Sequence, residues 1–142
     1  MLSNKSKYGL KAMMHLVGGE GPILAETIAR ERNIPRKFLD LILLELRRAG
    51  LINGKKGKGG GYSLARPPEH ITVGQVIRIL EGSFAPIGCT SRTDYKPCKD
   101  CPDEAACQIR DLMMDVRDQM SMVLDNTSII ALETRLTRAQ RL

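Results

Sequence analysis

The chain of 142 residues is long enough for one domain, or for a small domain with an appended helix. Only 4% of the residues are aromatic and none is Trp, a composition that favours helices over an all-strand fold. Its apolar runs are too short to cross a bilayer, and lysines interrupt the apolar N-terminal stretch. We therefore expect a cytoplasmic protein.

The positive charge lies in the first half of the chain. Residues 1–68 carry 13 Lys and Arg against 5 Asp and Glu, whereas residues 69–142 carry 9 against 11. A positive field concentrated on one module is typical of a polyanion binder, because a solvated basic surface would spread its charge. Nucleic acid is the expected partner, and a merely basic surface is the alternative.

The first 50 residues predict three helices. Residues 6–17 place Leu10, Met13, Met14 and Val17 at helical spacing. Residues 24–32 continue that spacing after a break rich in glycine, and Pro35 opens a third helix that Gly50 ends. The second and third helices, joined by a tight turn, predict a helix-turn-helix.

The third helix has one apolar face, formed by Leu39, Ile42, Leu43 and Leu46, which should pack on the first helix. The other face carries Arg36, Lys37, Asp40, Arg47 and Arg48. In a helix-turn-helix, residues near the start of the second helix meet base edges in the major groove. Arg36, Lys37 and Asp40 are therefore candidates for base readout, with a solvated charged face as the alternative.

Residues 51–64 predict a β-hairpin wing. Strands at residues 51–53 and 62–64 flank a loop of glycines and lysines. Lys55, Lys56 and Lys58 could follow phosphates or enter the minor groove, and we add Arg47 and Tyr62 to the candidate DNA contacts. A nucleotide-binding loop is disfavoured, because the spacing of a phosphate-binding loop and its strand-then-helix context are absent from the sequence.

The remaining helices follow the wing. Thr72 is expected to cap a helix that Gly82 ends, and another short helix should start at Asn126-Thr127. Between them, residues 104–124 predict one long helix with an apolar stripe formed by Ile109, Leu112, Met113, Val116, Met120, Val123 and Leu124. A second copy of the chain would cover this stripe, and burial under the winged domain is the alternative.

All four cysteines, Cys89, Cys98, Cys101 and Cys107, lie in one segment with the spacing C-x8-C-x2-C-x5-C. Four thiolates are a standard ligand set for iron-sulfur clusters with two or four irons (2Fe-2S or 4Fe-4S). The C-x2-C element is also half of a structural zinc site, and a thiol switch or vestigial cysteines are further possibilities. The residues alone leave these alternatives open.

The order of the motifs resembles the Rrf2 family of bacterial winged-helix regulators. The resemblance rests on the helix-turn-helix, on Leu-Arg-Arg-Ala-Gly-Leu-Ile, on Gly-Lys-Gly-Gly-Gly-Tyr-Ser-Leu-Ala-Arg, on Ile-Thr-Val-Gly-Gln-Val-Ile and on the cysteine segment. It implies a homodimer that binds a palindromic promoter site, and in some members an iron-sulfur cluster controls that binding. It also implies base contacts by Lys37 and Asp40, and a minor-groove contact by Lys56.

The resemblance further implies a ligand set. Cys89, Cys101 and Cys107 match the three cysteines of the cluster-binding members, and Cys98 is extra. Some members complete the cluster with a His or an Asp, at positions that here hold Arg110 and Lys7, neither a plausible iron ligand. Cys98 is therefore expected to be the fourth ligand, or a spare thiol exchanged on cluster conversion.

We therefore expect a mainly α protein, a non-enzymatic regulator of transcription. The expected parts are a winged helix-turn-helix domain with a two-stranded wing at residues 1–82, a cluster-binding loop at 83–107, and a dimerisation helix with a C-terminal helix at 108–142. One rival is a small redox protein whose basic half docks an acidic partner. Another is a DNA-binding regulator whose sensor is a partner protein or a small molecule.

Overall fold

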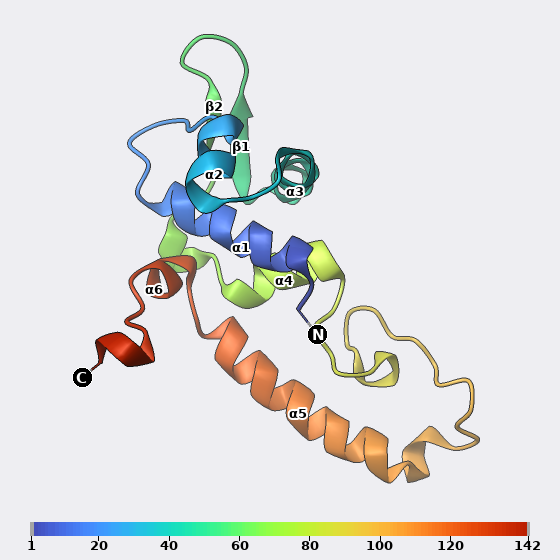
Figure 1. The fold of residues 1–142 in the computed structure, drawn as a ribbon. Helices are drawn as coiled ribbons and strands as arrows, with labels where there is room; N and C mark the ends of the chain where they lie inside the picture. Colours follow the sequence, from blue (N-terminus) through green and yellow to red (C-terminus); the bar gives the residue numbers. More distant parts are fainter. Residues whose placement is uncertain (1, 142) are drawn as a thin grey trace.

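The computed structural model describes residues 2–141 and is mainly helical, as expected. In chain order its elements are α1 (Asn4–Val17), α2 (Ala25–Arg32), α3 (Arg36–Arg48), β1 (Ile52–Lys55), β2 (Gly61–Leu64), α4 (Val73–Glu81), α5 (Gln108–Asp125) and α6 (Ile129–Glu133). Short 3-10 turns lie at η1 (Pro68–His70), η2 (Gly88–Thr90), η3 (Glu104–Ala106) and η4 (Arg138–Gln140). Figure 1 shows a winged body from which α5 extends away.

The expected helix-turn-helix is formed by α2, a tight turn and α3. Asn33 caps α2 in the left-handed region with a φ of 51°, which asparagine tolerates better than most residues. Pro35 stands immediately before α3, where its missing amide hydrogen costs no helical hydrogen bond. Ala49 caps the other end of α3, one residue before the predicted cap, and Gly50 follows with a φ of 80°.

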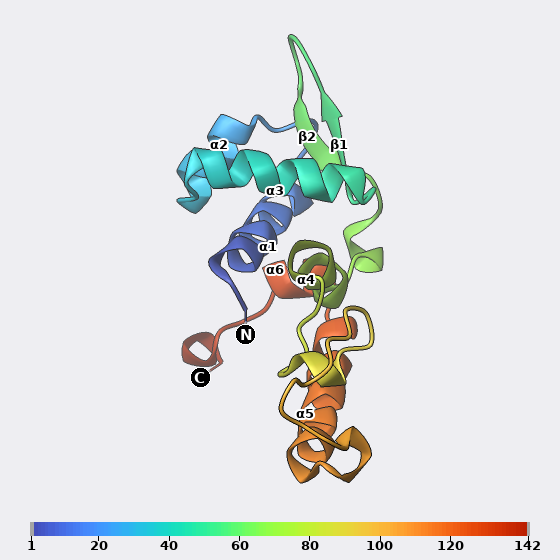
Figure 2. The same cartoon turned by 90° about the vertical axis from the view of Figure 1, so that its right-hand side faces the viewer.

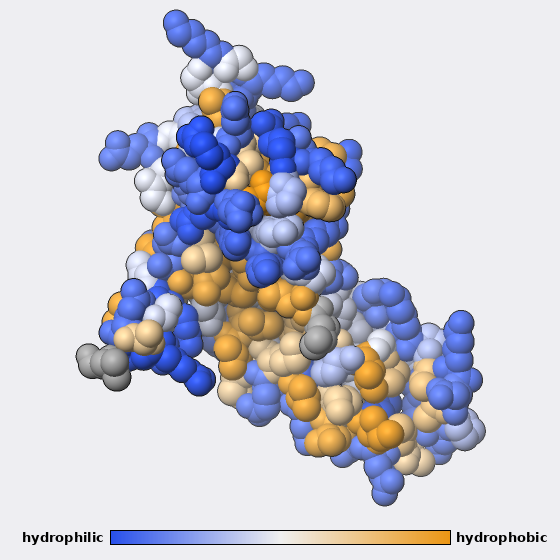
Figure 3. Space-filling model, in the orientation of Figure 1, coloured by the Kyte–Doolittle hydropathy of each residue, from blue (hydrophilic) through white to orange (hydrophobic). Residues whose placement is uncertain are grey.

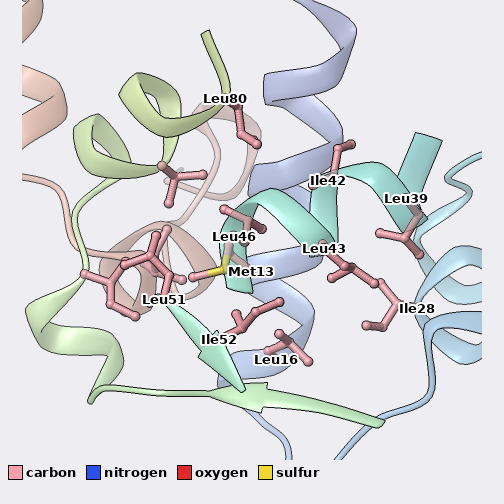
Figure 4. Close-up of a cluster of buried hydrophobic side chains, with 14 of the residues drawn as sticks. Met13, Leu16, Ile28, Leu39, Ile42, Leu43, Leu46, Leu51, Ile52 and Leu80 are labelled. Carbon is pink, nitrogen blue, oxygen red and sulfur yellow. The ribbon is translucent and has the colours of Figure 1, made fainter. Parts of the chain in front are cut away.

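The hydrophobic core lies between α1, α3, α4 and the first wing strand. Figure 4 shows the side chains that fill it, namely Met13, Leu16, Ile28, Leu39, Ile42, Leu43, Leu46, Leu51, Ile52 and Leu80. The predicted inner face of α3 is confirmed in full. This packing fixes α3 against the body, so its opposite face is turned to solvent.

The helix predicted at residues 6–17 is confirmed as α1, which begins two residues earlier than predicted, at Asn4. Leu10, Met14 and Val17 are half-buried, whereas Gly9 and Ala12 lie fully in the buried face. A Cβ at position 9 would overlap the Leu80 side chain of α4. The two helices approach closely at Gly9, and small residues share this buried face with Met13 and Leu16.

The wing is the predicted antiparallel hairpin, with longer strands than expected. Ile52 pairs with Leu64 and Lys55 with Gly61. The base of the wing is bonded to the α1–α2 connection, where Ile23 N donates to Tyr62 O at 2.8 Å and Tyr62 N donates to Ile23 O at 2.8 Å. These two bonds hold the wing beside the helix-turn-helix.

The predicted caps of α4 are confirmed. Thr72 Oγ1 accepts from Gln75 N at 3.1 Å, Thr72 N donates to Gln75 Oε1 at 3.0 Å, and Gly82 ends the helix with a φ of 81°. The last helix starts two residues later than predicted, at Ile129, because Ser128 caps it instead. The carbonyl of Thr127 instead accepts from Val73 N at 2.8 Å, which holds α6 on the body.

The long helix α5 begins at Gln108 and not at the predicted Glu104, because Cys107 caps it and residues 104–106 form a 3-10 turn. Among the described residues of α5, none is buried. Figure 2 shows the cysteine segment running alongside α5, below the winged body. No helix within residues 2–141 is long and apolar enough to cross a membrane.

Candidate functional site

The predicted base-reading residues of α3 are all exposed. Arg36 and Asp40 form an ion pair one helical turn apart, with 2.9 Å between Nε and Oδ1. The hydrogen bond to Asp40 raises the pKa of Arg36. Lys37 lies with its Nζ 5.2 Å from the centre of the Phe38 ring. Arg36 and Asp40 are therefore a mutually satisfied pair in the free protein, and Lys37 is an exposed cation.

The wing supplies the remaining cations. Lys55, Lys56 and Lys58 are exposed at its tip, where Gly57 and Gly59 take φ values of 87° and 73°. Such values favour glycine, which lets the loop turn sharply. Figure 2 shows the wing rising beside the C-terminal end of α3, so helix and wing offer cations to one region.

Arg47 and Tyr62 lie where α3 meets the wing. A Cβ at Gly54 would come within 3.2 Å of Arg47 Nη1 and 3.3 Å of the Tyr62 ring. The glycine therefore leaves room for both side chains. Arg47 is exposed, but Tyr62 is half-buried, and its backbone anchors the wing. Tyr62 therefore has a structural role at the base of the wing, in addition to its predicted contact with DNA.

The four cysteines line one hollow of about 280 Å³, between η2 and the start of α5. Cys89 is buried, Cys101 and Cys107 are half-buried, and Cys98 is exposed. Glu104 and Arg110 line the same hollow. The structure therefore brings all of the predicted ligands around a single space.

Two arginines of α5 hold the first cysteine. Arg110 Nε donates to Cys89 O at 3.2 Å, and Arg117 Nη1 donates to Thr90 O at 2.8 Å. Arg117 stands two turns along the helix from Arg110, so the η2 turn is fixed along α5. Both contacts use backbone carbonyls, which sequence patterns do not reveal. From the sequence, Arg110 was expected only to be an unsuitable iron ligand, and its hydrogen bond to the carbonyl of Cys89 was not predicted.

Cys107 is the N-cap of α5. Its Sγ accepts from Arg110 N at 3.4 Å. The start of a helix attracts negative charge, because its free amide hydrogens and its dipole both favour an anion there. Cys107 therefore places its sulfur at the amide end of α5, beside the hollow that all four cysteines line.

Two of the thiols are held in their protonated forms. Cys98 Sγ donates to Asp100 Oδ1 at 2.8 Å, which raises the pKa of Cys98 and lowers the pKa of Asp100. Burial and the neighbouring thiol of Cys107 raise the pKa of Cys101. Since a cysteine ordinarily titrates near about 8.5, both thiols carry protons at neutral pH. A metal would displace those protons.

Glu104 organises the loop that carries Cys98. Its carboxylate accepts from Tyr95 Oη at 2.5 Å and from Cys98 N at 3.3 Å, and lies 3.8 Å from Arg110 Nε. The hydrogen bond from Tyr95 lowers the pKa of Glu104, and the same bond raises that of Tyr95. Glu104 was not among the predicted site residues, although a carboxylate three positions before Cys107 is visible in the sequence.

The donor set suits a thiolate-bound iron cluster in kind and in location. Within residues 2–141, however, no group of at least three His, Cys, Asp or Glu side chains has the spacing of a formed metal site. The four thiols share a hollow without converging on one point.

A family model described as "Rrf2: Iron-dependent Transcriptional regulator" matches residues 2–134. An Rrf2-like HTH-type transcriptional regulator of Rhodobacter capsulatus is 37% identical over 134 residues, covering 91% of this chain and 89% of the relative. The HTH-type regulator CymR of Bacillus subtilis is 35% identical over 130 residues, covering 90% of this chain and 86% of the relative.

Solved structures agree with these relatives. The structure of CymR, the global cysteine regulator of B. subtilis, superposes with a TM-score of 0.77 at 33% identity, covering 96% of this chain and 98% of that one. IscR of T. potens superposes with a TM-score of 0.76 at 29% identity, covering 100% of this chain and 92% of that one. The matched relatives are regulators of transcription and not enzymes.

Proposed function

Since the chain belongs to the Rrf2 family of transcriptional regulators, we propose that it is a homodimeric repressor or activator controlled by an iron-sulfur cluster. In this proposal Cys89, Cys98, Cys101 and Cys107 hold the cluster, which has two or four irons, and its state sets the affinity of the dimer for a palindromic promoter site. The observation that carries the proposal is the shared hollow, because all four thiols of the chain line it.

DNA binding is assigned to α3 and the wing. The exposed side of α3 carries Lys37, Arg47 and the Arg36–Asp40 pair, which would face the major groove. Lys55, Lys56 and Lys58 at the tip of the wing would follow the phosphates or enter the minor groove. Because these contacts release counterions, the affinity for DNA should fall steeply as salt rises.

Dimerisation is assigned to α5. Its predicted stripe divides in the structure: Met120 and Leu124 pack against the body, whereas Ile109, Leu112 and Val123 remain exposed. Figure 3 shows hydrophobic surface along this helix. A second copy of α5 would cover that surface and would present two copies of α3 to a palindrome. Burial under the winged body accounts only for the part nearest that body.

The cysteine segment is joined to the DNA-binding body by a continuous series of contacts. Arg110 and Arg117 bind the η2 turn to α5. At its other end α5 is joined to α4 by Arg78, whose Nη1 and Nη2 donate to the carboxylate of Asp125 at 2.6 and 2.8 Å. A bound cluster would supply a reversible chemical signal. Through these contacts, a change at the cluster would alter the position of α5 relative to the DNA-binding body.

Metal and sulfide analysis tests the cluster. Protein purified without oxygen should absorb visible light and contain iron and acid-labile sulfide. Cys89→Ser, Cys101→Ser and Cys107→Ser should each lose most of the iron, while Ala106→Ser, an exposed neighbour of Cys107, should keep it. Iron retained in all three cysteine variants, or zinc bound without sulfide, would rule the cluster out.

The variant Cys98→Ser tests the fourth ligand separately. We expect it to bind iron with an altered visible spectrum, because an oxygen ligand or solvent would replace one thiolate. An unchanged spectrum and iron content would make Cys98 a spare thiol. The exposure of Cys98 and its hydrogen bond to Asp100 are compatible with both roles, fourth ligand and spare thiol. The spectrum and iron content of the variant decide between these two roles.

A second candidate is a thiol switch, favoured by the closeness of Cys101 and Cys107. A peroxide would oxidise the two thiols to a disulfide, taking two electrons and two protons, and would itself be reduced to water. Counting free thiols in iron-free protein after peroxide treatment tests this candidate. Loss of two thiols together with a change in DNA affinity would support it, and unchanged affinity would exclude it.

A further inference from the structure

The outer face of α3 carries two leucines between two cations. Lys37, Leu41, Leu44 and Arg48 follow one another at spacings of four, three and four residues, and so form one stripe along the helix. The opposite face is fully buried in the core. Leu41 is 51% exposed and Leu44 is 37% exposed, large fractions for leucines on a helix that already has a complete inner face.

These leucines do not complete the fold. The core beneath α3 is filled without them, since Leu39, Ile42, Leu43 and Leu46 occupy it. Figure 2 shows α3 lying across the front of the winged body, with the wing rising at its end. Figure 3 shows hydrophobic surface over α3 among hydrophilic residues. The stripe therefore has the position of a recognition surface and not that of an uncovered core.

The charges around the stripe favour DNA over another protein surface. Lys37 and Arg48 stand at its ends, and Arg47 lies beside it. The acidic groups nearby already have partners on the chain: Asp40 is paired with Arg36 at 2.9 Å, and Glu45 with Lys5 at 2.8 Å. Two copies of such a face would repel each other. A negatively charged groove that exposes apolar groups on its floor would complement both features.

The major groove of DNA is such a groove. Its only apolar group is the C5-methyl of thymine, which apolar side chains contact when they read that base. A rise of 1.5 Å per residue separates Leu41 and Leu44 by about 4.5 Å along the helix axis. Successive bases are about 3.4 Å apart along one strand, so the two leucines have a separation suited to neighbouring bases.

We propose that Leu41, with Leu44 beside it, selects thymine in each half-site by packing against the C5-methyl group in the major groove. This inference rests on the proposed DNA-binding function and adds an apolar element to the charged readout by Lys37 and Asp40. Burial of one methyl group changes the affinity by about fourfold. The preference for thymine over a base without the methyl group should therefore be modest at each position.

The test removes that methyl group. The protein is first used to select duplexes from a random library. The strongest duplex is then made again with deoxyuridine in place of thymidine, one position at a time, which removes only the methyl. We expect binding by the unaltered protein to weaken about fourfold at one or two positions in each half-site. Leu41→Ala should lose its sensitivity to deoxyuridine at one of these positions and keep the sensitivity elsewhere.

The control is Leu136→Ala, because Leu136 is 56% exposed and lies in the C-terminal tail, outside α3. This variant should respond to deoxyuridine as the unaltered protein does. Equal responses of Leu41→Ala and the unaltered protein would overturn the inference while leaving DNA binding intact. A loss of self-association in Leu41→Ala would also overturn the inference, because the stripe would then be an interface between proteins. A library without enriched sequences would overturn the proposed DNA-binding function as well.

Discussion

The winged body and the helix α5 are stabilised in different ways. In the body, side chains from α1, α3 and α4 fill a common core, and many of them have no solvent-exposed area. In α5 no described residue is buried, and Leu112 remains 57% exposed. The body is therefore stabilised by apolar side chains that are buried within a single chain. The exposed apolar surface of α5 is the surface that the proposed second copy of the chain would cover.

Besides the packing of Met120 and Leu124 against the body, polar contacts attach α5 to the rest of the chain. Arg78 joins it to α4, while Arg110 and Arg117 join it to the η2 turn. Of these contacts, Arg78–Asp125 is a partly exposed ion pair, and such pairs typically contribute less than about 1 kcal/mol to stability. Such an attachment can be rearranged without unfolding the core. This difference suits a body that reads DNA and a helix that reports the state of the cysteines.

The largest expected effect is a loss of core packing. Leu46 is fully buried, so Leu46→Ala should lower the free energy of unfolding by about 2–5 kcal/mol. The matched change Leu112→Ala on α5 should cost less than about 0.5 kcal/mol in the isolated chain. It should instead weaken self-association. Chemical denaturation measures the free energy of unfolding, and analytical ultracentrifugation measures self-association. An equal loss of unfolding free energy in Leu46→Ala and Leu112→Ala would contradict the proposed difference between the body and α5.

A smaller effect is expected at the base of the wing. Gly61 has a φ of 136°, and a Cβ there would lie 2.6 Å from the carbonyl of Ile23. Gly61→Ala should therefore destabilise the body by at least about 1–3 kcal/mol and weaken DNA binding. Gly57→Ala is the control, because its φ of 87° is also unfavourable but no atom lies within 4 Å. Unfolding curves should show the smaller loss for the control, and equal losses would exclude steric crowding against Ile23.

The attachment of α5 to α4 should contribute less. Arg78 and Asp125 are joined by two hydrogen bonds but remain partly exposed. A double-mutant cycle with Arg78→Gln and Asp125→Asn should give a coupling of about 0.5–1 kcal/mol in unfolding. The same variants should change how strongly the cluster affects DNA affinity. Unchanged regulation would show that the signal does not pass through this contact.

The smallest effect is a pH dependence within the body. Burial acts to raise the pKa of Glu81, but hydrogen bonds from Ser3 and Ser6 outweigh it and hold that pKa below the ordinary value of about 4.3. A depressed pKa adds stability above the unfolded value that is lost as the pH falls through the folded value. Stability should thus decline below about pH 4.3, and Glu81→Gln should flatten that decline. If the stability of Glu81→Gln declined equally steeply at low pH, the pH dependence would arise from other carboxyl groups.

The elements with local signals could be predicted from the sequence. The Thr72 cap, the Gly82 end of α4 and the glycine-rich wing each depend on residues a few positions apart. Local hydrogen bonding and backbone preference decide such features, so the pattern contains the needed information. The inner face of α3 was equally visible, because its apolar residues recur at helical spacing.

Features that depend on distant contacts could not be predicted in the same way. The place of Gly9 in the buried face of α1 could not be predicted, because its close approach to Leu80 joins residues far apart in the sequence. The start of α5 was placed too early because the sequence does not show that Cys107 acts as the cap. The bonds from Arg110 and Arg117 to backbone carbonyls leave no pattern at all.

Control of DNA binding by a cluster is tested most directly by the affinity for DNA of one protein preparation with and without its iron. The enriched palindromic duplex is titrated with cluster-loaded protein, and again after the iron has been removed and quantified. If a cluster controls DNA binding, the two affinities should differ at least tenfold, equivalent to about 1.4 kcal/mol of coupling. Cys107→Ser should bind with one affinity under both conditions. Equal affinities of the loaded and iron-free forms of the unaltered protein would contradict control by a cluster.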